Sequence, residues 1–154
     1  MKAQDTIIGA EAVTYQKANL LYYKNKFENG NVDYFTKGLE ISEKAYYSAL
    51  AIKRDYSLEF QQKMAEIDVL ITPTLPVPPP LLTQEVIQWK EFNEDILDAL
   101  SRFTAPFNMN GLPALSIPIG TNQNNLPIGL QLVGKMYDEH QLLSIGNTIT
   151  KLIN

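Results

Sequence analysis

Three short runs of apolar residues constrain the fold of this chain more than any other feature. They are residues 68–74, 114–119 and 128–133, and we interpret them as strands that are apolar on both faces. Strands of this kind usually belong to sheets that are covered on both faces. Natural sheets usually contain about four to six strands. Three strands make a thin sheet, so the chain looks like part of something larger.

The order and connections of these runs predict how the strands pair. We expect the strand at 68–74 to be buried at a central sheet position. The other two are joined by turn-forming residues at 120–127, so we expect them to be adjacent and antiparallel. Pro118 cannot donate a ladder hydrogen bond, which places its strand near an edge or interrupts the ladder. All three strands are expected in one mixed sheet.

Apolar residues at steps of three and four predict four helices, at about residues 6–27, 42–67, 91–103 and 138–153. Ser42 and Asp138 are the expected N-caps of the second and fourth helices, and residues 29–31 should end the first. The apolar face of the first helix includes Ile8 and Tyr15. The expected order is ααβαββα, an α/β fold with a sheet flanked by helices.

Prolines and glycines mark the connections between these elements. Five of the nine prolines lie within residues 73–80, which predicts an extended, polyproline-like crossing; a surface linker is the alternative. Gly111 should free the backbone to turn from helix to strand, and Pro113 should fix the entry to the next strand. Gly129 and Gly134 are interpreted as marking close backbone approach and strand exit, with a catalytic role as the alternative.

Composition excludes several classes of protein. A chain of 154 residues is expected to form one domain, and its net charge of −4 without a long basic run argues against nucleic acid as a ligand. No apolar run approaches the ~20 residues of a membrane-spanning helix, and the first residues do not resemble a secretory signal. A cytoplasmic location is therefore expected by default. The absence of cysteine removes disulfides, thiolate metal sites and a thiol nucleophile.

The residues themselves suggest no complete catalytic constellation. His140, the single histidine, is interpreted as a solvated side chain in the first turn of the last helix. Glu94, Asp95 and Asp98 are interpreted as a solvated helix face, because they lack a metal-ligand spacing. Phosphate-binding loops and a Gly-x-Ser-x-Gly segment are absent from the sequence. We therefore expect no cofactor and no metal.

Two longer motifs carry a resemblance to a known family. The run FTAPFNMNGLPALSIPIG at 103–120, followed by LPIGLQLVG at 126–134, closely resembles the C-terminal signature of amidase signature enzymes. The DVLITPT run at 68–74, ahead of its prolines, resembles the strand that precedes this block in the family. The resemblance covers about residues 43–152. It implies that the chain contains the C-terminal part of an amidase-signature sheet.

The resemblance also implies a chemistry that this chain alone cannot perform. Amidase signature enzymes hydrolyse carboxamides to a carboxylic acid and ammonia or an amine, using a serine nucleophile activated through a second serine, in a cis peptide, and a lysine. That triad lies N-terminal to the region resembled here. We therefore expect residues 1–154 to be a single C-terminal segment of an amidase-type domain whose catalytic part is absent, and to be inactive alone.

The choice between branches of the family depends on three positions. The glutamine-hydrolysing A subunits of glutamyl-tRNA amidotransferases bind their amino acid through an arginine and an aspartate. The resemblance aligns Lys53, or the adjacent Arg54, with that arginine and Ser101 with that aspartate. A serine hydroxyl cannot supply the negative charge that an α-ammonium group needs, so a general amidase for small-molecule or peptide amides is favoured. A solvated helix face is the alternative for Lys53 and Arg54.

Two expectations concern partners. A segment separated from the rest of its domain should expose apolar surface, and we expect a homodimer through that surface or pairing through a strand edge. The rival to an amidase fragment is a non-enzymatic interaction module that docks a partner chain.

Overall fold

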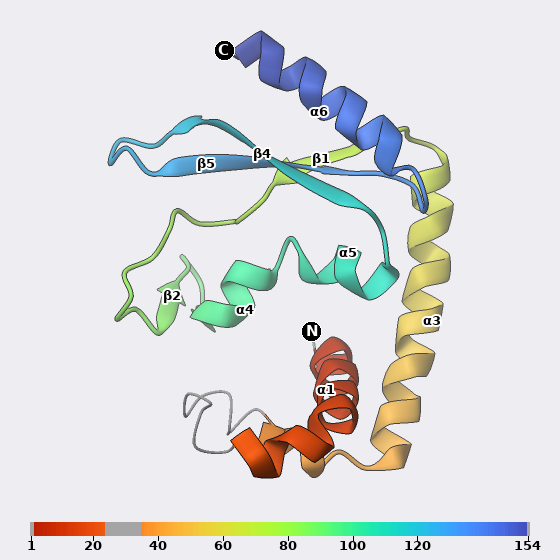
Figure 1. Ribbon diagram of the computed structural model, residues 1–154. Coiled ribbons are helices and arrows are strands. Elements are labelled where there is room, and N and C mark those ends of the chain that lie inside the picture. The colour runs from red at the N-terminus through yellow and green to blue at the C-terminus, as the bar shows by residue number, and fades with distance from the viewer. Residues whose placement is uncertain (1, 24–34, 154) are drawn as a thin grey trace. The chain divides into compact units, whose positions relative to one another are not determined.

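The computed structural model describes residues 2–23 and 35–153 (Figure 1). Their contacts divide the chain into two compact units, Met1–Tyr56 and Ser57–Asn154. The predicted end of the first helix, at residues 29–31, lies outside the described residues. Among the described helices, none combines the length and the apolar character needed to cross a membrane.

The first unit contains helices. Helix α1 covers Lys2–Tyr23, residues 35–39 are helical, and α3 covers Glu43–Ala65 and continues into the second unit. The predicted N-cap of α3 is confirmed, because Ser42 Oγ accepts a hydrogen bond of 3.2 Å from the Ala45 N–H. On α1, Ile7 and Val13 are buried, whereas Ile8 and Tyr15 are exposed. The expected apolar face of this helix is therefore wrong.

The second unit contains a three-stranded sheet of β1 (Leu70–Pro73), β5 (Pro127–Val133) and β4 (Ala114–Thr121), in that order. Both pairings are antiparallel, which confirms the predicted pairing of the last two strands. The expected central and buried position of β1 is wrong in this sheet: β5 lies between the other two strands, and Ile71 of β1 is 53% exposed. Pro118 lies on β4 at a sheet edge, where a missing N–H is tolerated. These three strands contain no parallel pair, so the mixed character expected of the sheet is not found among them.

Helices pack against both faces of this sheet, as its apolar strands predict. On one face Leu132 and Ile117 pack with Leu142 of α6 (Glu139–Ile153). On the other face Val133 packs with Phe107 and with Met64 near the end of α3. Figure 1 shows α6 along one side of the sheet and α4 and α5 on the opposite side. Adjacent residues of β5 thus serve two separate cores, because side chains alternate along a strand.

The segment between the proline run and β4 differs from the single helix expected at 91–103. A hairpin forms first, from β2 (Val86–Gln88) and β3 (Asn93–Asp95), and two short helices follow, α4 (Ile96–Ser101) and α5 (Ala105–Asn110). The Asp95 carboxylate accepts a 2.8 Å hydrogen bond from the Leu97 N–H, so α4 begins only after it. Pro106 in the first turn of α5 cannot sit inside a continuous helix. The order ααβαββα therefore omits the hairpin, the short helical stretch at residues 35–39, and one of the two helices that replace the single one expected at 91–103.

The turn from α5 into β4 follows the sequence prediction. Gly111 caps α5 in the left-handed conformation, with φ of 66°, which a glycine adopts without strain. The chain then enters β4 through Pro113.

Candidate functional site

The proline segment at 73–80 lines two hollows on the second unit. The larger, of about 570 Å³, lies between this segment and the β4–β5 hairpin. The smaller, of about 340 Å³, is lined by Pro73, Pro76, Trp89, Phe92, Arg102 and Phe103. Pro73 and Pro76 border both hollows, so this segment does more than link two elements.

A pair of hydroxyl groups lies in the larger hollow. Thr74 Oγ1 and Ser116 Oγ are 2.6 Å apart and share a hydrogen bond. The Thr74 N–H also donates to the Gly129 carbonyl, at 2.9 Å. A Cβ atom on Gly129 would lie 2.6 Å from Thr74 Oγ1, which confirms the predicted close approach at this glycine.

The chemistry available to this hydroxyl pair is limited. The residues that line the larger hollow include no lysine, histidine or carboxylate. A serine becomes a nucleophile when a base within hydrogen-bond reach takes its proton. These hydroxyls can therefore hydrogen-bond a polar ligand, but the lining of this hollow does not activate either of them.

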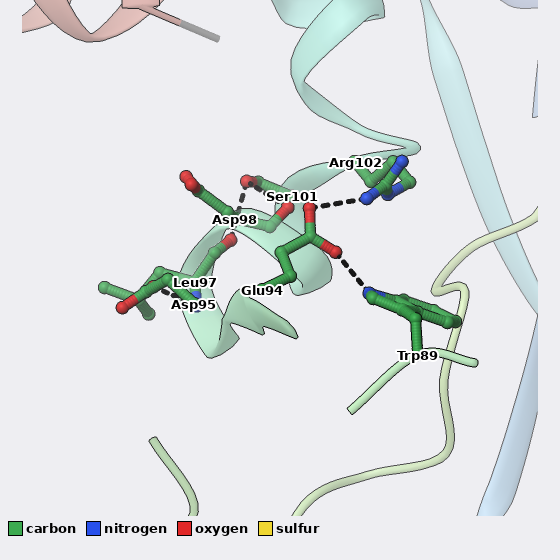
Figure 2. A network of polar contacts seen from close by, with 7 residues as sticks. All are labelled: Trp89, Glu94, Asp95, Leu97, Asp98, Ser101 and Arg102. Carbon is green, nitrogen blue, oxygen red and sulfur yellow. Dashed lines mark hydrogen bonds and ion pairs between the residues drawn. The ribbon is translucent and has the colours of Figure 1, made fainter. Parts of the chain in front are cut away.

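A polar network around Glu94 connects two residues that line the smaller hollow, Trp89 and Arg102 (Figure 2). One carboxylate oxygen accepts a 2.5 Å hydrogen bond from Arg102, and the other accepts one of 2.7 Å from Trp89 Nε1. The Arg102 guanidinium carbon also lies 5.7 Å from the centre of the Trp89 ring, a cation–π distance. The side chain of Glu94 is only 14% exposed, compared with 41% for Arg102.

The local fold explains why these three residues meet. Trp89 closes the hairpin turn, where its N–H donates to the Phe92 carbonyl at 2.8 Å, and Glu94 lies on the returning strand opposite Ile87. Helix α4 then brings Arg102 back towards both side chains. The hydrogen bond from Arg102 lowers the pKa of Glu94 below its ordinary value of 4.5, and the bond from Trp89 lowers it further, while burial opposes both.

A buried glutamine connects this region to the sheet. Gln131 of β5 is 3% exposed, and its Nε2 donates to Thr72 Oγ1 at 3.0 Å and to the Phe103 carbonyl at 2.7 Å. It thereby ties β5 both to β1 and to the chain between α4 and α5. This contact positions Phe103, and with it one wall of the smaller hollow, relative to the sheet.

The substrate-binding residues expected from the sequence lie in separate units. Ser101 ends α4, and its hydroxyl donates to carbonyls of its own helix, Leu97 at 2.7 Å and Asp98 at 3.3 Å. Lys53 and Arg54 lie on α3 within the first unit, where Arg54 forms an exposed 2.9 Å ion pair with Asp55. Their role in substrate binding stays a prediction.

Two other sequence interpretations have clear outcomes. His140 is exposed in the first turn of α6, as expected. Glu94 does not lie on a solvated helix face with Asp95 and Asp98, because it belongs to β3 and is bonded to Arg102 and Trp89. Recognising the hairpin would have revealed this network, since only a chain reversal brings Trp89 back beside Glu94. In the described part of the chain, no group of three or more histidine or acidic side chains could hold a metal ion.

Comparison with known proteins gives consistent results. A family model described as Amidase matches residues 22–143. The A subunit of the glutamyl-tRNA(Gln) amidotransferase of Ehrlichia canis (strain Jake) is 35% identical over 108 residues, which are 70% of this chain and 21% of that protein. A fatty acid amide hydrolase of Medicago truncatula is 33% identical over 107 residues, 70% of this chain and 18% of that protein.

A solved structure extends the comparison to the fold. The crystal structure of an amidase superposes with a TM-score of 0.88 at 25% identity, covering 97% of this chain and 34% of the other. The chain therefore spans about a fifth of the length of these sequence relatives and a third of that structure.

Proposed function

This chain belongs to the amidase family, and we propose that it forms the C-terminal part of a serine-dependent amidase. The complete enzyme would hydrolyse carboxamides to a carboxylic acid and ammonia or an amine. The observation that carries the proposal is that the sequence match and the fold match coincide over most of the chain. We also propose a cytoplasmic location, which is expected from the composition of the chain.

We propose that residues outside this chain supply the nucleophile. The Thr74–Ser116 pair has hydroxyl groups at hydrogen-bond distance, but the lining of their hollow provides no base. The hollows beside the proline segment would then contribute to binding the amide, and the cleavage step would depend on the remainder of the enzyme. The chain alone should leave amides intact.

Among amidases, we favour an enzyme for small-molecule or peptide amides over one that hydrolyses glutamine. The Ser101 hydroxyl is neutral and donates its hydrogen bonds to carbonyls of its own helix. These properties argue against Ser101 as the partner of an α-ammonium group. The sequence relative among A subunits keeps the glutamine-hydrolysing function as the alternative. Lys53 and Arg54 remain the residues we propose for anion binding in either case.

A chimera tests the proposal directly. In the chimera, residues 1–154 would take the place of the matching third of the amidase whose crystal structure superposes on this chain. The release of ammonia would be measured from a panel of carboxamides and from glutamine. We expect turnover of simple carboxamides by the chimera and none by the chain alone. The matched control is the same chimera with its nucleophilic serine replaced by alanine.

Two outcomes would contradict the proposal. Amide turnover by the chain alone, abolished by changing one of its own serines, would show that it carries a complete site. A folded chimera that binds amides but hydrolyses none would favour the non-enzymatic interaction module. This second candidate is supported by the exposed side chains of Leu81 and Leu82, at 76% and 107%, because exposed apolar side chains of this kind can dock a partner chain. A chimera that prefers glutamine would support the A-subunit alternative.

We also propose that the chain self-associates when the rest of an amidase does not cover it. Exposed apolar side chains occur on β1, just after the proline segment and on α6, including Ile71, Leu82 and Leu143. Surface of this kind tends to be buried by association. A two-fold dimer is expected, since one patch then serves both partners.

A further inference from the structure

The smaller hollow is lined by flat or rigid groups. The rings of Trp89 and Phe92 lie 6.1 Å apart at an angle of 34°, and the Arg102 guanidinium lies 5.7 Å from the Trp89 ring centre. Phe103 and two prolines complete the lining. Its volume of about 340 Å³ is at the lower end of the ~300–1,000 Å³ typical of small-molecule sites. Such a space suits a single planar ring better than a long flexible chain, because aromatic groups stack on one another and on guanidinium planes.

The charges of the hollow determine which ring-bearing molecules it accepts. Glu94 neutralises Arg102 through their 2.5 Å contact, so the pair presents little net charge to a ligand. Arginine has five N–H donors, and the bond to Glu94 uses one of them, which leaves donors for a carbonyl oxygen. A carboxylate ligand would gain less, because it would also be repelled by Glu94.

We propose that this hollow binds the aromatic ring of an uncharged amide, with the amide oxygen hydrogen-bonded to Arg102. The inference rests on the proposed amidase function and adds a substrate class to it, namely aromatic amides such as benzamide. Trp89, Phe92 and Phe103 hold the ring, and Glu94 acts as a positioning residue that orients Arg102 and sets the charge of the site.

The single tryptophan of the chain provides the measurement. Trp89 lies in the hollow, so its fluorescence, excited at the red edge of its absorption, reports ligand binding to the full chain without any turnover. We would titrate benzamide, benzoate and acetamide. Benzamide should give a saturable change, benzoate a weaker one, and acetamide a linear, unsaturable change at most.

Two variants make the test specific to the hollow. Phe92→Ala removes a half-exposed wall and should weaken benzamide binding by about threefold to tenfold. Leu97→Ala is the matched control, because Leu97 is 72% exposed on α4 and does not line the hollow. Glu94→Gln removes the neutralising charge and should shift the affinity ratio from benzamide towards benzoate by about threefold or more. Circular dichroism would verify that each variant folds.

The inference would be overturned by equal, unsaturable responses to benzamide and acetamide, or by benzamide binding that Phe92→Ala and Glu94→Gln both leave unchanged. The outcome is separable from that of the proposed function. Ring binding by the chain with an inactive chimera would defeat the function and leave this inference intact. An active chimera without a preference for ring-bearing amides, together with no saturable Trp89 response, would support the proposed function and defeat this inference.

Discussion

Glu94 shows how one side chain can set the properties of its neighbours. Its two oxygens bond to groups that the hairpin and α4 supply separately, so the carboxylate holds a ring and a cation in fixed positions. A charged acceptor strengthens both hydrogen bonds, because charge-assisted bonds are roughly twice as strong as neutral ones. The orientation of Trp89 and Arg102 therefore depends on the ionised form of Glu94.

This dependence predicts how stability responds to pH. The folded-state pKa of Glu94 is lowered, first by the bond from Arg102, so its contribution to stability is present above the ordinary value of 4.5. The contribution is lost as the pH falls through the lowered pKa. We expect the free energy of unfolding to decrease below about pH 4.5, and the Glu94→Gln variant to lose part of that decrease. Urea unfolding of the original chain and of Glu94→Gln, from pH 7 to about pH 3, measures this decrease. Parallel pH curves for the two chains would contradict the role assigned to Glu94.

At the scale of elements, Gln131 joins three segments that are far apart in sequence. It is buried, and its amide nitrogen satisfies both a threonine hydroxyl on β1 and a backbone carbonyl at Phe103. Buried polar groups are almost always hydrogen-bonded, since an unpaired one is costly. Gln131 therefore fixes how the chain after α4 lies against the sheet.

Replacing this glutamine with a leucine of similar size should separate the contact from the packing. Gln131→Leu leaves the Phe103 carbonyl without its donor, and we expect the free energy of unfolding to fall by about 1–3 kcal/mol. Gln123→Leu, in the exposed connection between β4 and β5, is the matched control and should change it by about 0.5 kcal/mol at most. Equal effects of the two substitutions on urea unfolding would show that the Gln131 bonds contribute nothing.

The sequence predicts elements well where one local signal dominates. The Ser42 cap, the left-handed Gly111 and the β4–β5 pairing each depend on residues close together in the chain, and all three are confirmed. The hairpin before α4 was not predicted, because Phe92 and Ile96 have helical spacing and the Asp95 cap competes with that period. The Glu94 network was missed with it. Its members contact one another only after the chain has turned back.

At the scale of the whole molecule, the position of β1 has the largest consequence. The residues of this strand, apolar on both faces, suit a buried position, yet among the described strands it pairs only with β5. One of its edges therefore has no partner strand in the described sheet, and Ile71 is 53% exposed. An unpaired apolar edge favours association with another chain. In a complete amidase, the region beyond this chain would be expected to cover such surface.

The unpaired apolar edge of β1 predicts self-association that disappears when the remainder of an amidase is present. Sedimentation of the chain should show a concentration-dependent dimer, and Ile71→Lys should weaken it by placing a charge on the exposed edge of β1. Leu97→Lys places the same charge at an exposed position on α4, which packs on the β2–β3 hairpin, and should have little effect. The chimera with the remainder of an amidase should show no association through Ile71, because the added region would cover it. A strict monomer at high protein concentration would contradict the predicted dimer. Equal effects of both lysine substitutions would show that the dimer does not form through the edge of β1.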